Sequence, residues 1–309
     1  MEASKVIVDT SPAPTPQRKK VNYTPYLFMS PALLILLSVV ILPILYSFYI
    51  SFFRYQLNAP QLGVDFIGLD NYTAIAGDEQ MIQSVQWTLL FTLIVVTIEV
   101  FLGMGLALLL NSSILGWMRN LLRGIFLVPI MLSGVVSAWM WRLLFDTTYG
   151  PVNHFITSLG LDAVPWGADA VSARAMVVIA DVWLATPFVM LILLAGLQNI
   201  PEELMEAASI DGATAWQKFL RITLPLLKFP IMVVLVIRTM DALRSFDQVF
   251  VLTSGGPGSS TSTIMYYNYR YAFYYFRMGR AAAVAFAFLL VILVITYIYT
   301  RLLRREAEA

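Results

Sequence analysis

The sequence contains no cysteine and a single histidine, His154. The first absence excludes disulfides, thiolate metal sites and cysteine nucleophiles. One histidine does not build a zinc site alone, so His154 is expected to be a polar loop residue. We therefore expect neither a metal site nor a catalytic residue in this chain.

Charged residues are also scarce. They make up 13% of the 309 residues, whereas hydrophobic residues make up 59%. Such a chain has too little polar surface to cover a water-soluble body of its size. Its formal net charge of +1 provides no strongly basic face, which argues against nucleic acid as a partner. The composition predicts an integral membrane protein surrounded by lipid.

The apolar runs predict one all-α domain over residues 26–305. Residues 1–25 contain the polar, proline-rich stretch "TSPAPTPQRKK" and are expected to form a disordered tail. The first apolar run is longer than that of a cleavable signal, about 7–15 residues, and should stay in the membrane. Because a spanning helix needs about 20 apolar residues, six spans are predicted, near 27–53, 86–110, 124–145, 174–197, 226–250 and 281–301.

Basic residues predict the orientation of these spans, since Lys and Arg near a span are retained on the cytoplasmic side. One side carries 12 of them: Lys5, Arg18, Lys19, Lys20, Arg119, Arg123, Lys218, Arg221, Lys228, Arg301, Arg304 and Arg305. The other side carries 6: Arg54, Arg142, Arg174, Arg270, Arg277 and Arg280. It also holds the acidic loop with Asp65, Asp70, Asp78 and Glu79. Both termini are therefore predicted to be cytoplasmic.

A polar segment at 199–225, on the cytoplasmic side by this assignment, is predicted to form two short helices. Asn199 and Pro201 suit the start of the first helix, and Gly212 suits its end, because glycine readily adopts the left-handed conformation. Thr214 can cap the second helix, which Pro225 is expected to close. From the residues alone, the segment either docks onto another protein or lies on the lipid headgroups.

Within that segment, Glu206-Ala207-Ala208, Gly212, Ile222 and Leu224-Pro225 resemble the EAA signature of permease subunits of bacterial ABC importers. Three further stretches resemble the sugar-importer branch, similar to the maltose and glycerol-3-phosphate systems. They are "DVWLATPFVMLILLAGLQNIP" at 181–201, "FDQVFVLTSGGPGSST" at 246–261 and "MGRAAAVAFAF" at 278–288. The resemblance covers much of the chain after Leu121.

The resemblance implies that this segment is a coupling loop seated in a cytoplasmic ATPase subunit. Glu206 would pair with a basic residue there, Gly212 would set the angle between the helices, and the second arm would anchor through Phe219, Ile222, Leu224 and Pro225. The implied partners are a second permease subunit, two ATP-binding subunits and an extracytoplasmic solute-binding protein, in a bacterial plasma membrane. Because the chain lacks a GxxxxGK[ST] phosphate loop, ATP and Mg²⁺ would be bound by the partner subunits.

Ionisable residues inside spans are candidates for the substrate site, because burying charge in lipid costs free energy. Arg238, Asp241, Ala242 and Ser245 are spaced to share one face of the fifth span, which we expect to line a wet interior. Together with Asp181, the polar members Arg238, Asp241 and Ser245 supply the donors and acceptors that sugar hydroxyls need. The resemblance adds Leu184, Ala185 and, less directly, Gly134. Glu99 lacks such support and is expected to serve helix packing or to face headgroups.

Alternatives remain at this point. Arg238 or Arg244 could simply pair with Asp241 or Asp181 to join helices, or the two arginines could bind a phosphorylated polyol such as glycerol-3-phosphate. An ion-coupled secondary transporter would show broken spans in both halves of the chain. In this sequence an interrupted span is evident in only one half. The glycine-rich stretch at 253–261 is expected to be a tight external turn. The tyrosine-rich stretch at 264–276 is expected to anchor at the membrane interface or, as a second reading, to contact an external binding protein.

Overall fold

The computed structural model describes residues 24–59, 61, 63–112 and 116–307. Residues 1–23 lie outside this part, so the predicted tail remains a prediction. The chain divides into two units, Met1–Tyr46 and Ser47–Ala309. In the first unit, α1 (Thr24–Leu36) continues through the π-helical turn η1 (Leu37–Ile41) into α2 (Leu42–Ile50), whose last residues belong to the second unit. Pro43, the second residue after this turn, has no N–H to donate to the helix.

The second unit begins with a small hairpin, β1 (Phe53–Arg54) and β2 (Asp65–Phe66), paired antiparallel with Phe53 opposite Phe66. The remaining elements are helices: α3 (Asp70–Ala76), α4 (Glu79–Asn111), α5 (Met118–Leu127), η4 (Pro129–Met131), α6 (Gly134–Leu144), α7 (Pro151–Ser158), α8 (Ala170–Gln198), α9 (Glu202–Ile210), α10 (Ala215–Lys218), η5 (Phe219–Thr223), α11 (Leu224–Leu226), α12 (Lys228–Leu243), α13 (Asp247–Leu252), α14 (Ile264–Tyr269), η6 (Arg270–Tyr274) and α15 (Met278–Ala307). His154 lies exposed on α7 rather than in a loop.

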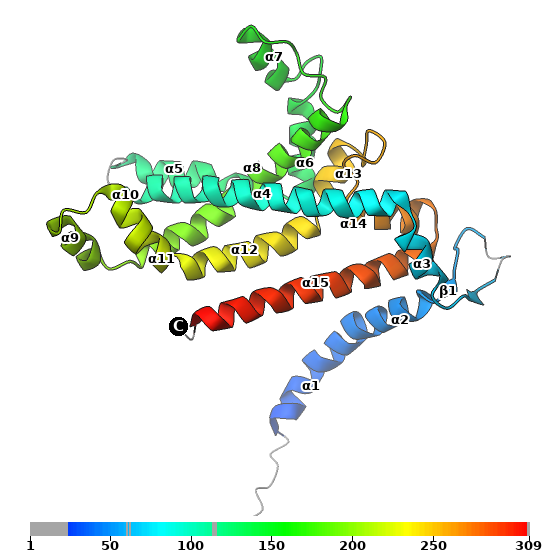
Figure 1. Cartoon of the computed structure of the whole chain (residues 1–309). Helices are drawn as coiled ribbons and strands as arrows, with labels where there is room; N and C mark the ends of the chain where they lie inside the picture. The colour runs from blue at the N-terminus through cyan, green and yellow to red at the C-terminus, as the bar shows by residue number, and fades with distance from the viewer. Residues whose placement is uncertain (1–23, 60, 62, 113–115, 308–309) are drawn as a thin grey trace, which may run out of the picture. The chain divides into compact units, whose positions relative to one another are not determined.

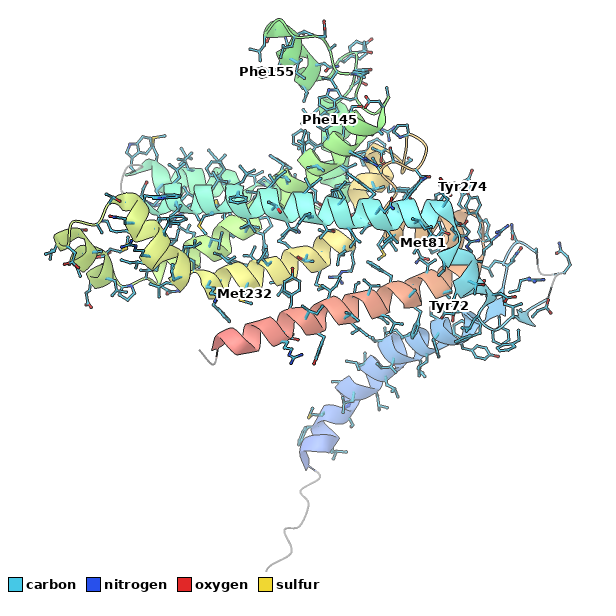
Figure 2. The ribbon with its side chains drawn as sticks, in the orientation of Figure 1. Tyr72, Met81, Phe145, Phe155, Met232 and Tyr274 are labelled. Carbon is cyan, nitrogen blue, oxygen red and sulfur yellow. The ribbon has the colours of Figure 1, made fainter. Side chains whose placement is uncertain are left out.

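The long helices α4 and α8 form the centre of this unit. They approach closely where Gly103 of α4 faces Val189 of α8, because a Cβ at Gly103 would lie 2.6 Å from Val189 Cγ1. Helices α12 and α15 run alongside α4, with α3 and β1 at one end and α9 and α10 at the other (Figure 1). Side chains fill the space between α4 and α15, including Met81 of α4 and, at the end of this space, Tyr72 of α3 (Figure 2).

Four of the six predicted spans are confirmed as long apolar helices, within Leu27–Ile50, Glu79–Asn111, Ala170–Gln198 and Met278–Arg301. The third and fifth predicted spans are not continuous helices, because each of these regions consists of a bent pair of helices. The third span bends by 102° between Met118–Met131 and Gly134–Leu144. The bend follows from Pro129 and from the extended backbone of Leu132 and Ser133. The Ser133 hydroxyl then accepts a hydrogen bond from Val136 N and caps α6.

The fifth predicted span also has different limits. Ala215–Leu226 and Lys228–Leu243 form a pair bent by 63°, so the membrane helix α12 begins after the bend. Pro225 does not close the second arm of the coupling loop as predicted, since α11 continues to Leu226. Helix α12 ends at Leu243, and Ser245 therefore lies beyond it rather than on the same helical face as Arg238.

Candidate functional site

A buried charged network joins α4, α8 and α12 in the middle of the bundle. Arg238 donates two hydrogen bonds to the carboxylate of Glu99, from Nε at 2.7 Å and from Nη2 at 2.9 Å. Its Nη2 also contacts Asp181 Oδ2 at 3.0 Å. The Glu99 side chain is fully buried, and only 9% of the Arg238 and Asp181 side chains is exposed. The three groups satisfy one another away from water, which is the condition for a stable buried charge.

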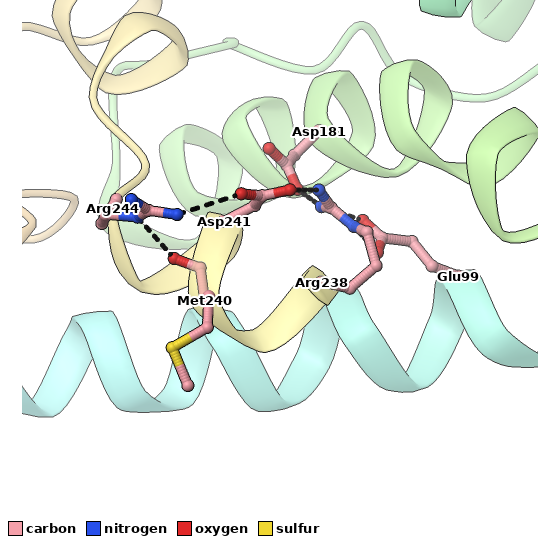
Figure 3. Close-up of polar contacts among 6 residues, drawn as sticks. All are labelled: Glu99, Asp181, Arg238, Met240, Asp241 and Arg244. Carbon is pink, nitrogen blue, oxygen red and sulfur yellow. Dashed lines mark hydrogen bonds and ion pairs between the residues drawn. The ribbon is translucent and has the colours of Figure 1, made fainter. Parts of the chain in front are cut away.

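The network continues from Arg238 through Asp241 to Arg244 (Figure 3). Asp241 Oδ2 lies 3.7 Å from Arg238 Nη1, and Asp241 Oδ1 accepts a hydrogen bond of 3.4 Å from Arg244. Arg244 Nε also donates to the carbonyl of Met240 at 3.0 Å. About half of each of these two side chains is exposed, 49% for Asp241 and 52% for Arg244. The network thus has a closed inner part and an open outer pair.

The predicted stripe on α12 is only partly correct. Arg238 and Ala242 are buried, so they do not face a wet interior in this conformation, whereas Asp241 does remain accessible. Ser245 is buried, and its hydroxyl has no hydrogen-bond partner among the described residues. Its carbonyl accepts a bond from Thr263 Oγ1 at 2.9 Å. Of these four residues, Asp241 is therefore the most open to a ligand.

The residues added by resemblance lie around the network. Ala185 is buried and Leu184 half-buried on α8, within one turn of Asp181. Gly134 begins α6 and faces Asp247 of α13, where a Cβ would collide with the carboxylate. Gly134 therefore makes room for an acidic side chain at the N-terminus of α6, where the helix dipole favours negative charge.

An apolar cavity of about 410 Å³ lies between α4, α5, α6 and α8. Its walls include Trp141, Trp183 and Phe126. The one hydroxyl in its lining, on Thr186, already donates to the Val182 carbonyl at 2.6 Å. The cavity thus offers few groups to hydrogen-bond a polyhydroxylated ligand, in contrast to the open end of the charged network.

The coupling loop forms a bent pair of helices, as predicted. Helix α9 ends with Gly212 in the left-handed region, at φ +73°. Ala213 N then donates to Ala208 O at 2.9 Å and Gly212 N to Ser209 O at 3.1 Å, which is the Schellman pattern of helix termination. Thr214 caps α10 in a reciprocal capping box with Gln217. Asn199, however, ends α8, and α9 begins after Pro201.

The residues of the signature are largely open to solvent. Glu206, Ala207, Leu224 and Pro225 are exposed, and Ala208, Phe219 and Ile222 are half-buried. Lys218 Nζ donates to Ser209 Oγ at 2.8 Å and links the two arms across Gly212. The base of the loop is packed, because a Cβ at Gly196 would lie 2.8 Å from both Leu227 and Pro230. The loop thus presents an accessible surface on a firmly held base.

Sequence reasoning missed a second polar cluster, at the opposite end of α4. Asp78 caps α4 and accepts hydrogen bonds from Tyr267 at 2.9 Å and Tyr271 at 3.1 Å, and it pairs with Arg280. Burial opposes ionisation of Asp78, but the hydrogen bonds from Tyr267, the backbone and Tyr271 outweigh it and hold its pKa below 3.8. The two tyrosines are buried rather than anchored at a membrane interface, whereas Tyr274 is exposed.

Comparison with known proteins identifies the family. Residues 99–308 match the family described as "Binding-protein-dependent transport system inner membrane component". The chain belongs to this family. It is 43% identical over 236 residues to the trehalose/maltose transport system permease protein MalF of Thermococcus litoralis, covering 76% of this chain and 79% of that protein. It is 39% identical over 237 residues to the sulfoquinovosyl glycerol transport system permease protein SmoG of Agrobacterium fabrum, covering 76% and 75%.

A solved structure agrees with this assignment. A chain of a bacterial ABC transporter involved in the import of the acidic polysaccharide alginate superposes with a TM-score of 0.79 and 26% identity, covering 92% of this chain and 96% of that one. The permease fold and the prediction of a sugar ABC importer are thereby confirmed. The chain is a multi-pass membrane subunit that acts in transport rather than as an enzyme. The family also decides against the secondary transporter that the sequence analysis left open.

Proposed function

We propose that this permease subunit forms half of a pathway for an uncharged oligosaccharide of disaccharide type, and that the sugar contacts the open end of the charged network. The observation that carries this proposal is the division of the network. Glu99 and Asp181 are occupied by Arg238, whereas Asp241 and Arg244 are half-exposed and held to each other by a long contact of 3.4 Å. Sugar hydroxyls donate and accept, so they can bind this carboxylate and guanidinium together.

The balance of charge favours a neutral substrate over glycerol-3-phosphate. Three carboxylates, Glu99, Asp181 and Asp241, face two guanidinium groups, Arg238 and Arg244. A phosphate would bring its negative charge beside the Asp241 carboxylate at the open end, in a medium where unpaired charge is costly. The buried Ser245 hydroxyl, which has no partner among the described residues, is a further group for a sugar.

Transport by the reconstituted complex tests this site. Asp241→Asn should raise the apparent KM for labelled maltose or trehalose about tenfold, because a charged hydrogen bond to a hydroxyl contributes about 1.5 kcal/mol. Asp162→Asn, at an exposed position in the loop before α8, is the matched control and should leave KM unchanged. Equal KM values in the Asp241 variant and the wild type would remove Asp241 from the site. Uptake of glycerol-3-phosphate in preference to both disaccharides would reverse the choice of substrate.

We further propose that the loop over 199–225 docks into a cytoplasmic ATPase subunit, with both termini of the chain on the same side. A second permease subunit would complete the pathway, two ATPase subunits would bind ATP and Mg²⁺, and a solute-binding protein would deliver the sugar on the other side. The exposed Glu206 and Ala207 and the bend at Gly212 support this role, because they present a small-residue face that another surface can approach closely.

Cross-linking tests the docking directly, because the chain has no cysteine of its own. Ala207→Cys, in the loop, should cross-link to the ATPase subunit. Ala163→Cys is the control, since it is equally exposed but precedes α8, whereas Ala207 follows it. Cross-linking of both positions, or of Ala163 alone, would contradict the proposed orientation.

A further inference from the structure

A small polar cavity lies at the end of the second unit that is opposite the coupling loop. Its volume is about 210 Å³, and its lining includes Arg54 of β1, Arg277 and Arg280 at the start of α15, and Asp70 and Asn71 of α3. We call it the arginine pocket, after Arg54, Arg277 and Arg280. Three guanidinium groups in one small cavity are unusual in a chain with so few charges, and none of them belongs to the transport network described above.

The backbone around the pocket is held by hydrogen bonds from several elements. The Asn71 amide donates to the carbonyls of Ser51 at 2.8 Å and Phe53 at 2.9 Å. Leu57 N donates to Phe276 O at 3.0 Å, and Gly279 N donates to Tyr55 O at 3.2 Å. The strand that carries Arg54 is thereby tied to the segment that carries Arg277. The pocket is a preformed feature rather than a chance meeting of surface side chains.

The charges in the pocket are incompletely paired. Arg280 is engaged by Asp78 and Tyr267, although its Nε is buried and has no partner among the described residues. The side chains of Arg54 and Arg277 make neither an ion pair nor a hydrogen bond within the part of the chain that the structure describes. Asp70 is the one carboxylate in the lining. The pocket therefore has guanidinium donors left for an anionic group, and a planar carboxylate matches their forked geometry.

The pocket lies where two predicted spans reach the surface on this side, since Arg54 directly follows the span 27–53 and Arg280 directly precedes the span 281–301. Helix α4 starts with Glu79, Gln80, Gln83 and Gln86, and its continuous apolar run begins only after Trp87. These first nine residues extend about 13 Å, so this edge of the pocket reaches beyond the lipid headgroup layer, which is about 5–8 Å thick, and is open to a protein in water. Helix α3 and the hairpin precede α4 and lie at its end (Figure 1). Leu57, Phe66 and Leu69, which are close by in sequence, are exposed as well.

We propose that the arginine pocket receives an aspartate or glutamate side chain of the extracytoplasmic solute-binding protein. This inference rests on the proposed function, because it takes the pocket to lie on the side opposite the ATPase subunits. The carboxylate enters between Arg54 and Arg277, and Arg280 is held in place behind them by Asp78. The pocket thereby fixes where the binding protein sits relative to α4 and α15.

Binding measurements on the complex in lipid nanodiscs test the inference. The probe is the solute-binding protein that stimulates ATP hydrolysis by the wild-type complex. Arg54→Gln and Arg277→Gln should each weaken its binding about fivefold at low salt, and together about tenfold or more, because exposed charge pairs contribute modestly. The double variant should also lose most of the salt dependence of binding. These two arginines are chosen because Arg280 supports the fold through Asp78.

Arg301→Gln is the matched control, since Arg301 is exposed at the other end of α15, and it should bind like the wild type. Unchanged affinity and salt dependence in the Arg54/Arg277 double variant would overturn the inference while leaving the proposed function in place. Unchanged affinity together with loss of co-purified acidic phospholipid would assign the pocket to a lipid and would overturn the inference too. A wild-type complex that no solute-binding protein stimulates would instead refute the proposed function, and the inference with it.

Discussion

Replacement of Arg238 by methionine is the most direct test of the buried network. In the wild type, both Glu99 oxygens are bonded by Arg238 at 2.7 and 2.9 Å, and Asp181 lies 3.0 Å from the same guanidinium. Methionine keeps much of the volume but leaves two carboxylates facing each other without a cation. Removing one partner of a buried ion pair costs about 3–5 kcal/mol, so Arg238→Met should lower the free energy of unfolding by about that amount.

Reversible unfolding of the purified subunit in mixed detergent and SDS micelles measures this free energy. Arg244→Met is the matched control, because its partner contact is half-exposed and should contribute less than about 1 kcal/mol. Adding Glu99→Gln and Asp181→Asn to Arg238→Met should restore most of the stability, since no unpaired charge then remains. A loss in Arg238→Met no larger than that in Arg244→Met would refute the reasoning, and so would a triple variant no more stable than the single one.

Two further predictions concern other parts of the second unit. Gly103→Ala should lower the free energy of unfolding by about 1–3 kcal/mol, because the added methyl group overpacks against Val189. Gly105→Ala is the control and should be neutral or slightly stabilising, because a Cβ there meets open space. Equal effects of the two substitutions in the same unfolding assay would contradict the α4–α8 packing. Asp78→Asn should cost about 2–3 kcal/mol at neutral pH. Because the pKa of Asp78 is lowered by folding, its contribution is complete above 3.8 and is lost as the pH falls through the folded value. The difference in thermal stability between wild type and Asp78→Asn should therefore shrink below pH 3.8. A difference that stays constant with pH would show that the charge of Asp78 does not stabilise the fold.

The sequence was sufficient for the features that depend on local pattern. The long apolar runs predict α4, α8 and α15, because a run of that length and composition forms a spanning helix. In the coupling loop, Gly212 and Thr214 predict where one short helix ends and the next begins. The bends at 129–133 and at Leu227 were not predicted, because apolar composition continues across them while the backbone changes direction. Glu99 was set aside because the family resemblance did not include it among the substrate-site residues. Its partner, Arg238, is 139 residues away, and only the packing of α4 against α12 brings them together.

The same limitation explains Asp78, and it suggests what would have found both sites. An ionisable group inside a mostly apolar chain requires a partner of opposite charge or several hydrogen bonds. Arg238 in a span therefore implied carboxylates on neighbouring helices, and Glu99 and Asp181 were the available ones in the long spans.

The tyrosines near Asp78 were harder to assign, because interface anchoring and buried hydrogen bonding use the same amphipathic side chain. For Tyr267, burial against Asp78 decides between these two roles.

The placement of the network relative to the coupling loop links binding to movement. Helix α8 carries Asp181 and leads into the loop, and the loop leads into α12, which carries Arg238. At the base of the loop, Gly196 of α8 packs against Leu227 and Pro230, so the two helices are joined there as well. A force on the loop therefore acts on both helices together, and each of them also contacts α4: α8 through Val189 against Gly103, and α12 through Arg238 bound to Glu99. Asp241 lies on α12 one turn from Arg238. A movement of α12 relative to α4 would therefore also move the open end of the network, where we place the sugar.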